Sequence, residues 1–420
     1  MSLRNRELAN LIVVGMLTAI GFASVYIARQ AVVSTGSLAY AGFFFALYLA
    51  AHLVSRLTVP NADPYLLPMA ALLTAVGLTE IYRLDPTDAF RQGLWIVVAV
   101  GALAATLFLL HRDYRRLESY KYLFGLAAIG LLVLPALPVF GQSINGARLW
   151  IHFGSLQFQP GEIAKVLLIV FLAGYLREKR EVLAQGRLKD FGPLLVIWGG
   201  AMLVLVETND LGSALLYFGI FLAMLYVATG RLAYVLIGGV LFVGGAAGAY
   251  KLIGHVRTRV EIWIDPWPHI HTSGYQITQS LYSISNGGFG GAGLGKGTFT
   301  TTNGATLIPS ANTDFIYSAI AQELGLVGAA ALLLVFMLFI ARGMKVAMLA
   351  DDGFSKLLAA GLTFSFALQT FIIVGGILRM IPLTGVTLPF VSYGGSSVVA
   401  NFVLLAGLLL ISNRSNAPAR

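Results

Sequence analysis

Long apolar runs dominate the chain, and short polar connections separate them. Most runs are about twenty residues long, which is the length that an α-helix needs to cross the hydrocarbon core of a bilayer. The runs do not alternate apolar and polar positions, as the strands of a membrane β-barrel would. The pattern therefore predicts an all-α fold, a polytopic transmembrane helix bundle of about 12 spans.

The apolar runs form one membrane domain. The predicted spans are Leu8–Ala28, Thr35–Val54, Tyr65–Ile81, Gly93–Leu110, Tyr120–Pro138, Pro160–Leu176, Phe191–Val206, Asp210–Ala228, Leu232–Leu252, Phe315–Ile340, Phe354–Leu378 and Gly394–Ile411. Residues 1–60 hold two spans, 61–253 hold spans 3–9, 254–313 form a large loop, and 314–420 hold spans 10–12. Only Glu207, Thr208 and Asn209 separate spans seven and eight, which predicts a tight helical hairpin.

Basic residues gather in alternate connections, and this asymmetry predicts the orientation, because cytoplasmic loops are enriched in Lys and Arg. The basic connections contain Arg4 and Arg6; Arg112, Arg115, Arg116 and Lys121; Arg177, Lys179, Arg180, Arg187 and Lys189; Arg342 and Lys345. Both termini are then cytoplasmic. The loops that carry Arg148, Asp314 and Ser392 are external.

The external loop between spans nine and ten is too long to be a simple connection. It contains Trp263, Trp267, Tyr275 and Tyr282, and such aromatic side chains favour the membrane interface. We expect short amphipathic segments there.

Composition supports the membrane prediction and excludes several classes of function. The chain is 57% hydrophobic and 11% charged, whereas a soluble domain carries about 25% charged residues. Cysteine is absent, which excludes disulfides and thiolate metal sites. The net charge of +9 indicates no nucleic-acid partner, since it follows from the basic cytoplasmic loops.

Asp314 stands between the large polar loop and the tenth predicted span. Thr313 and Asp314 occupy the position of a helix N-cap, so capping alone is one interpretation. A helix N-terminus also favours the ionised carboxylate, which suits a general base or a ligand for a hard cation. Ionisable groups at the rim of a membrane bundle are costly and often functional. We predict that Asp314 is catalytic, with metal binding as a further role.

A second cluster opens the sixth predicted span. Pro160 suits the first turn of a helix, and Glu162 and Lys165 then lie three residues apart on one face. One interpretation is a buried ion pair that closes a helix contact. The other is substrate binding, with Lys165 holding an anion while Glu162 and Gln159 orient it.

Two arginines are candidate ligands for phosphate groups, because a guanidinium matches phosphate geometry. Arg148 lies in a short external loop beside Trp150, so interfacial anchoring is the alternative. Arg259 lies in the large loop, where it could equally be a solvated charge.

Polar side chains suited to an anion or a sugar complete the candidates. Ser392, Ser396 and Ser397 open the last span, where hydroxyls and amides can bind an anion or small residues can pack closely. Gln276 and Gln279 offer amides for sugar hydroxyls or loop scaffolding. Gly290 to Gly297 resembles a nucleotide-binding P-loop by chance, since it follows no strand and no Ser or Thr comes directly after Lys296.

Six motifs in this order resemble those of the SEDS family, the shape, elongation, division and sporulation proteins of bacteria. They are GARLW, FQPGEIAK, NDLGSA, GYQITQS, IPSANTDFIYSAIAQELG and LTGVTLPFVSYGGSS, between about Tyr65 and Ser412. The family pattern places its essential aspartate on Asp314, its conserved glutamate and lysine on Glu162 and Lys165, and its arginine on Arg148. The resemblance also implies ten spans, so the first two spans here look like an addition.

The resemblance implies a peptidoglycan glycosyltransferase that polymerises lipid II at the outer face of the bacterial plasma membrane, for elongation and cell shape or for division. Its expected partners are a class B penicillin-binding protein and other cell-wall elongation or division proteins. The stretch after Asp210 looks closer to elongation-type members, such as RodA. The expected mechanism has Asp314 activate the acceptor hydroxyl, directly or through a divalent cation such as Mg²⁺ or Mn²⁺, while Arg148, Lys165 and Arg259 hold the diphosphate. No organic cofactor is expected. The alternatives from other classes are a lipid II flippase or transporter and a structural scaffold for cell-wall assembly.

Overall fold

The structure is a computed structural model that describes residues 2–30, 35–137, 140–144, 147–153, 156–185, 192–298 and 307–417. The first helices are α1 (Leu3–Gln30), α2 (Thr35–Thr58), α3 (Leu66–Leu84), α4 (Pro86–Leu110), α5 (Arg116–Ser119) and α6 (Lys121–Val133). Those in the middle are α7 (Pro160–Ala184), α8 (Gly192–Glu207), α9 (Leu211–Thr229), α10 (Leu232–Leu252), α11 (Gly254–Ile264) and α12 (Tyr275–Gly287). The last are α13 (Ile316–Leu349), α14 (Gly353–Ile377) and α15 (Gly395–Ser415).

The predicted helical membrane bundle is confirmed. In the part of the chain that the structure describes, nine helices are long and apolar enough to cross a membrane, and α6 and α8 are shorter apolar helices. Together with α7, whose last turns are charged, they correspond to the twelve predicted spans. The predicted ends Pro138 and Phe191 lie outside the described residues.

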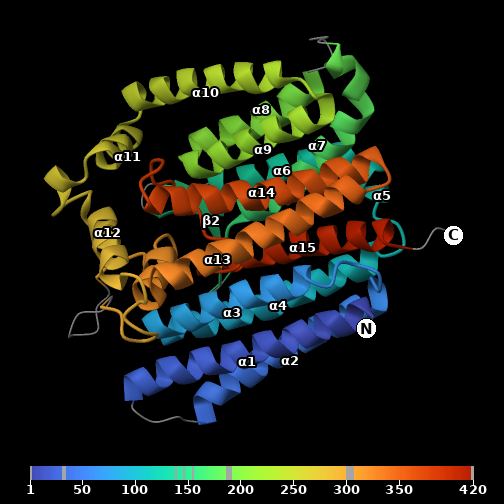
Figure 1. Cartoon of the computed structure of the whole chain (residues 1–420). Coiled ribbons are helices and arrows are strands. Elements are labelled where there is room, and N and C mark those ends of the chain that lie inside the picture. The colour runs from blue at the N-terminus through green and yellow to red at the C-terminus, as the bar shows by residue number, and fades with distance from the viewer. Residues whose placement is uncertain are drawn as a thin grey trace.

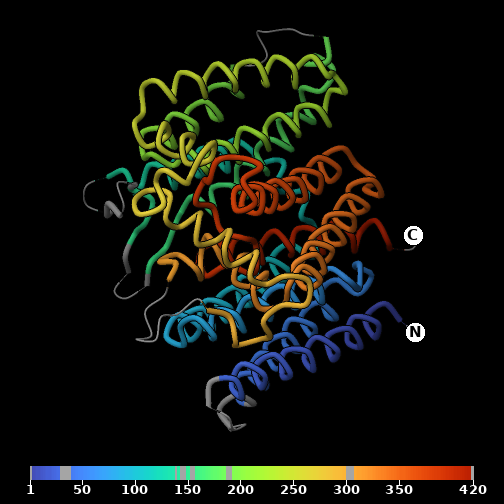
Figure 2. The backbone as a smooth tube through the Cα atoms, turned by 60° about the vertical axis from the view of Figure 1, so that its left-hand side comes forward, coloured from blue at the N-terminus to red at the C-terminus, as the bar shows by residue number. Residues whose placement is uncertain are grey.

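The long helices run side by side, and their connections gather at the two ends of the bundle (Figure 1). The start of α1 and the end of α15 lie at the same end, while α11 and α12 cover the opposite end. Helices α1 and α2 form one flank, α8 to α10 form the other, and α13 to α15 lie between them (Figure 1 and Figure 2). Helices α11 and α12 lie in the large loop, where the sequence predicted short amphipathic segments.

A small antiparallel sheet that the sequence analysis did not predict joins α6 to α7. Its strands are β1 (Gly141–Ile144), β2 (Ala147–Phe153) and β3 (Leu156–Phe158), in the order β1-β2-β3. Ile151 pairs with Gly141 on one side and with Phe158 on the other. The alternating residues of β2 form too short a pattern to stand out among long apolar runs.

Helix α13 is not one continuous span as predicted. Gly325 has φ 67°, which breaks the helix into a short N-terminal part and a long C-terminal part. At this break the glycine-rich segment Gly287–Gly297 packs against α13, with Ala292 and Gly293 donating backbone hydrogen bonds to the carbonyls of Gln322 and Glu323.

The Glu323 carboxylate holds the same glycine-rich segment. It accepts hydrogen bonds from the backbone N–H groups of Gly295 and Gly297 at 2.7 and 3.1 Å and pairs with Arg83 of α3 at 2.6 Å. The segment that mimics a P-loop is therefore a backbone contact between the large loop and α13. Residues 299–306, further along the loop, lie outside the described residues.

Candidate active site

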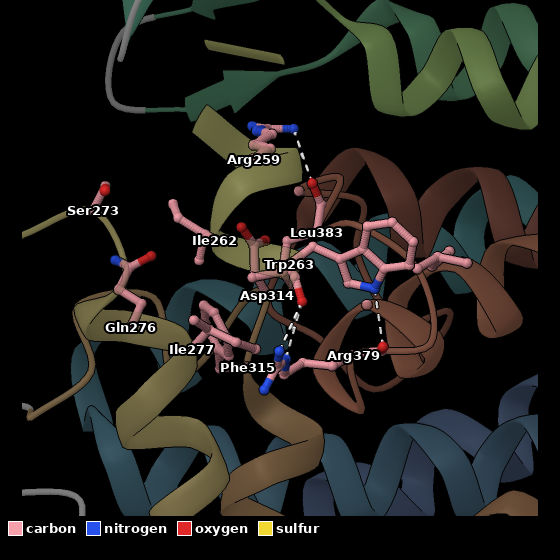
Figure 3. Close-up of a pocket in the computed structure, with 13 residues that line it drawn as sticks. Arg259, Ile262, Trp263, Ser273, Gln276, Ile277, Asp314, Phe315, Arg379 and Leu383 are labelled. Carbon is pink, nitrogen blue, oxygen red and sulfur yellow. Dashed lines mark hydrogen bonds between the residues drawn. The ribbon is translucent and has the colours of Figure 1, made fainter. Parts of the chain in front are cut away.

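A pocket of about 170 Å³ lies at the end of the bundle that α11 and α12 cover. Its charged lining residues are Asp314, Arg259 and Arg379, and its polar side includes Ser273 and Gln276. Figure 3 shows where these side chains come from: Arg259 from α11, Gln276 from α12 and Ser273 from the segment before it, Asp314 from just before α13, and Arg379 from the connection between α14 and α15. The pocket is therefore built both from helices α11, α12 and α14 and from the irregular connections beside them.

Asp314 lies two residues before the first residue of α13. The N-cap residue is Phe315, with no side-chain cap hydrogen bond, so the interpretation of Asp314 as a helix cap is wrong. Burial raises the pKa of Asp314 to about 6, while the charge of Arg259 and the Thr313 hydroxyl act in the opposite direction. The carboxylate is thus mainly ionised at neutral pH and close to the range in which a general base works best.

Arg259 of α11 lies beside Asp314. Its Nη1 donates to the carbonyl oxygens of Leu383 and Thr384 at 3.3 and 3.1 Å. A methyl carbon built on Gly385 would lie 3.7 Å from Asp314 Oδ2 and 3.9 Å from Arg259 Nη2. Both charged groups therefore border the space above this one glycine, whose φ is 76°.

Arg379 anchors the pocket wall. Its Nη2 donates to the carbonyl oxygens of Trp263 and Ile264 at 2.9 and 2.7 Å, at the end of α11. Trp263 returns a hydrogen bond from Nε1 to the Arg379 carbonyl at 2.9 Å. These contacts bind α11 to the connection after α14 and so place Arg259 over Gly385.

The predicted Glu162 and Lys165 pair is present at the start of α7. Lys165 Nζ lies 2.8 Å from Glu162 Oε2 and donates to Gln369 Oε1 at 2.7 Å, and its side chain is 3% exposed. Gln369 in turn donates to the Thr387 carbonyl at 2.9 Å. Sequence reasoning missed Gln369, because nothing in the sequence of α14 shows that this amide faces α7.

The three candidate serines lie inside the protein. The Ser396 hydroxyl accepts from the backbone N–H of Gln159 at 2.7 Å, and Ser397 receives a hydrogen bond from Thr387 Oγ1 at 2.8 Å. Ser392 donates to the Thr313 carbonyl at 2.6 Å. Each hydroxyl thus has a protein partner, and anion binding by these serines stays a prediction.

The remaining candidates lie at different distances from Asp314 in the fold. Gln276 lines the pocket, whereas Gln279, one turn further along α12, is half-buried outside it. Arg148 is exposed on β2, where its backbone N–H donates to Thr208 at 3.4 Å at the turn between α8 and α9. Substrate binding by Gln279 and Arg148 also stays a prediction.

Asp210 lies near enough to both Glu162 and Arg259 for their charges to act on its pKa, and sequence reasoning did not select it. Its carboxylate caps α9 by accepting from Ser213 N at 3.0 Å. Burial raises the pKa of Asp210, and the charges of Glu162 and Arg259 act on it in opposite directions. The Asp-Leu-Gly sequence at a helix start is the signal that could have identified this cap.

A dedicated metal centre does not fit the pocket. Within the described ranges, no group of three or more His, Cys, Asp or Glu side chains could hold a metal ion. The other charged groups of the pocket are Arg259 and Arg379, both cationic. One carboxylate fits only a cation that a substrate's phosphates also bind, as Mg²⁺ often is.

Comparison with known proteins agrees with this architecture. The family model of the FtsW, RodA and SpoVE proteins, described as "Cell cycle protein", matches residues 64–417. The peptidoglycan glycosyltransferase RodA of Mycobacterium leprae is 42% identical over 91% of this chain and 84% of its own length. The probable peptidoglycan glycosyltransferase FtsW of Geobacter metallireducens is 32% identical over 85% of this chain and 96% of its own length.

A solved structure shows the same fold. It is described as structural coordination of polymerization and crosslinking by a peptidoglycan synthase complex, and one of its chains matches with a TM-score of 0.68 at 30% identity. The match covers 84% of this chain and 98% of that chain. The names of these similar proteins favour a glycosyltransferase over a transporter. The family model and the identities over most of the chain show that this multi-pass membrane protein belongs to the SEDS family, the FtsW, RodA and SpoVE proteins.

Proposed function

We propose that the protein is a peptidoglycan glycosyltransferase that polymerises lipid II, the undecaprenyl-diphosphate-linked disaccharide peptide. The observation that carries the proposal is a single carboxylate, Asp314, with a pKa of about 6 in a pocket beside Arg259. The leaving group of this reaction is a lipid diphosphate, which needs cationic stabilisation more than a general acid. One base and one arginine then suffice for the chemistry.

Asp314 takes the proton from the acceptor sugar hydroxyl. The hydroxyl oxygen attacks the donor's anomeric carbon, and the bond from that carbon to the diphosphate breaks with inversion of configuration. Arg259, whose guanidinium borders the same space, stabilises the departing diphosphate. If the substrate's phosphates carried Mg²⁺ or Mn²⁺, Asp314 would be the pocket carboxylate able to contact the ion, which would supply further positive charge for the leaving group.

Lys165 and Arg148 have lesser roles in this mechanism. The Lys165 ammonium already contacts Glu162 and Gln369, so it would contact a diphosphate only by exchanging one of these partners. Arg148 is exposed outside the pocket and could act on a more distant part of a long substrate.

The orientation and partner belong to the same proposal. The chain ends are cytoplasmic, so the pocket end faces outward, in line with the basic connections at the opposite end. The similar solved structure is a complex for polymerization and crosslinking. A class B penicillin-binding protein that cross-links the new strands is therefore the proposed partner.

The test is polymerisation of lipid II by the purified protein in detergent. Asp314→Asn should lower the rate by about 10²–10⁴-fold, the usual contribution of a general base. The matched control is Asp265→Asn, a carboxylate in the same loop that accepts from Trp267 N at 3.2 Å and does not line the pocket. Wild-type rates from folded Asp314→Asn protein would refute the proposal, and lipid movement across vesicles without polymer would favour the transporter.

A further inference from the structure

Ser392 is bound to the residue directly before Asp314. Its hydroxyl donates to the Thr313 carbonyl at 2.6 Å and accepts from the backbone N–H of Leu388 at 2.9 Å. The side chain is 2% exposed. A hydroxyl has only one proton to donate, so this serine cannot also donate to a substrate anion while it holds Thr313.

The next residue along continues the same attachment. The backbone N–H of Tyr393 donates to the carbonyl of Asn312 at 2.8 Å. The Asn312 side chain donates to Asp88 Oδ2 of α4 at 2.6 Å. Two consecutive carbonyls before Asp314 are thus bound by two consecutive residues of the connection between α14 and α15.

Gln92 of α4 fixes that connection from behind. Its Nε2 donates to the Ser392 carbonyl at 3.2 Å, and its Oε1 accepts from the backbone N–H of Gly394 at 3.1 Å. The side chain is 1% exposed. Both ends of a fully buried amide are therefore used to hold the short segment that carries Ser392.

We infer that Ser392 and Gln92 are positioning residues, which together hold the Thr313–Asp314 backbone so that the Asp314 carboxylate faces Arg259 across Gly385. The same connection supplies Gly385, the two carbonyls that hold Arg259, and the hydroxyl that holds Thr313. The base and its arginine are thereby placed against one common segment. This inference rests on the proposed function, because it assigns what Asp314 needs in order to act.

The test measures kcat and KM for lipid II polymerisation by the full-length purified protein. Ser392→Ala should lower kcat by about tenfold to 100-fold with little change in KM, since a displacement of about 1 Å in the reacting groups can have that effect. Ser392→Thr, which keeps the hydroxyl, should restore most of the rate. Gln92→Ala should lower kcat as Ser392→Ala does. Because both residues hold the same segment, the double variant should be at most about threefold slower than the slower of the two single variants.

The matched control is Ser355→Ala at the other end of the bundle. Ser355 is 1% exposed and bonds to Tyr114 and Asp352, so its loss removes comparable hydrogen bonds far from the pocket. It should lower the melting temperature without changing kcat.

Three results would overturn the inference. The first is a kcat of Ser392→Ala no lower than that of Ser355→Ala, and the second is a raised KM with intact kcat, which would make Ser392 a substrate ligand. The third, used if Ser392→Ala does not fold, is a normal kcat for Gln92→Met, which loses the donor to the Ser392 carbonyl and the acceptor for Gly394. An Asp314→Asn variant with wild-type activity would instead refute the proposed function itself.

Discussion

Two charged clusters lie near the pocket end of this bundle, and their side chains are satisfied to different degrees. Lys165 is buried, and its ammonium contacts both Glu162 and Gln369. Asp314 forms no ion pair within the described residues, although Arg259 is near enough to act on its pKa. The first cluster has the contacts of a structural element, whereas the second leaves a carboxylate and a guanidinium facing an open volume. We therefore expect the reaction to take place at Asp314 and Arg259 and not at the Glu162–Lys165 pair.

The largest effect is expected in the first cluster, the Glu162–Lys165 pair with Gln369. Lys165→Met leaves the Glu162 carboxylate buried without its cation, which should lower the free energy of unfolding by about 3–5 kcal/mol. Thermal unfolding in detergent measures this loss. The double variant Glu162→Gln with Lys165→Met should recover most of the stability, because both charges are then gone. A double variant that is stable yet inactive would show that the pair also acts on substrate.

Arg259→Gln should have the next largest effect, and on activity instead of stability. It removes a charged hydrogen-bond donor from the leaving diphosphate, which is worth about 1.5–3 kcal/mol in kcat/KM. The control on the same helix is Arg257→Gln, whose exposed guanidinium pairs with Glu261 at 2.8 Å outside the pocket. Equal activity of the two variants would remove Arg259 from the mechanism.

The raised pKa of Asp314 predicts how the polymerisation rate depends on pH. The base is ionised above a pKa of about 6, so the rate should fall about tenfold between pH 7 and pH 5. Stability should change in the opposite direction: the folded carboxyl binds its proton more tightly than the unfolded one, so its contribution rises as the pH falls below 6. A flat rate profile from pH 7 to pH 5 would contradict the role of Asp314 as a base.

The smallest effect is expected at Gly385. Gly385→Ala places a methyl group between Asp314 and Arg259 and adds left-handed backbone strain of about 1–2 kcal/mol. Gly230→Ala is the matched control, because its φ of 69° brings similar strain but no atom lies within 4 Å of the new carbon. Both variants should lose similar stability, and only Gly385→Ala should also have a moderately lower polymerisation rate. Equal rates would mean that the space above Gly385 is not used.

The membrane spans could be predicted from the sequence because the bilayer requires long apolar helices whatever else the protein does. The tight turn between α8 and α9 could be predicted for the same reason, because two full spans leave only a few residues between them. In the structure it covers residues 208–210, one residue later than Glu207–Asn209. The kink at Gly325 could not, because one glycine in an apolar run is compatible with a straight helix.

The charged residues of the site could be predicted from the sequence, but the hydrogen bonds that position them could not. Asp314, Glu162 and Lys165 are conspicuous because ionisable residues are rare in such a chain. Gln369 and Gln92 were missed, because their hydrogen-bond partners are far away in the sequence. Asp210 was missed although its position at a helix start marks it as a cap. Ser392 was selected for a different role, since a hydroxyl at a helix start looks the same whether it faces a ligand or a neighbouring carbonyl.

The contact between the glycine-rich segment and α13 has a consequence for how this protein can evolve. Main-chain atoms make most of the contact, so side chains along the segment are largely free to drift. Gly291, Gly293 and Gly295 are not free, because their φ values of 83°, 97° and 81° suit few other residues. Relatives should therefore keep the spacing of these glycines and an acidic residue at the position of Glu323, while the residues between the glycines vary.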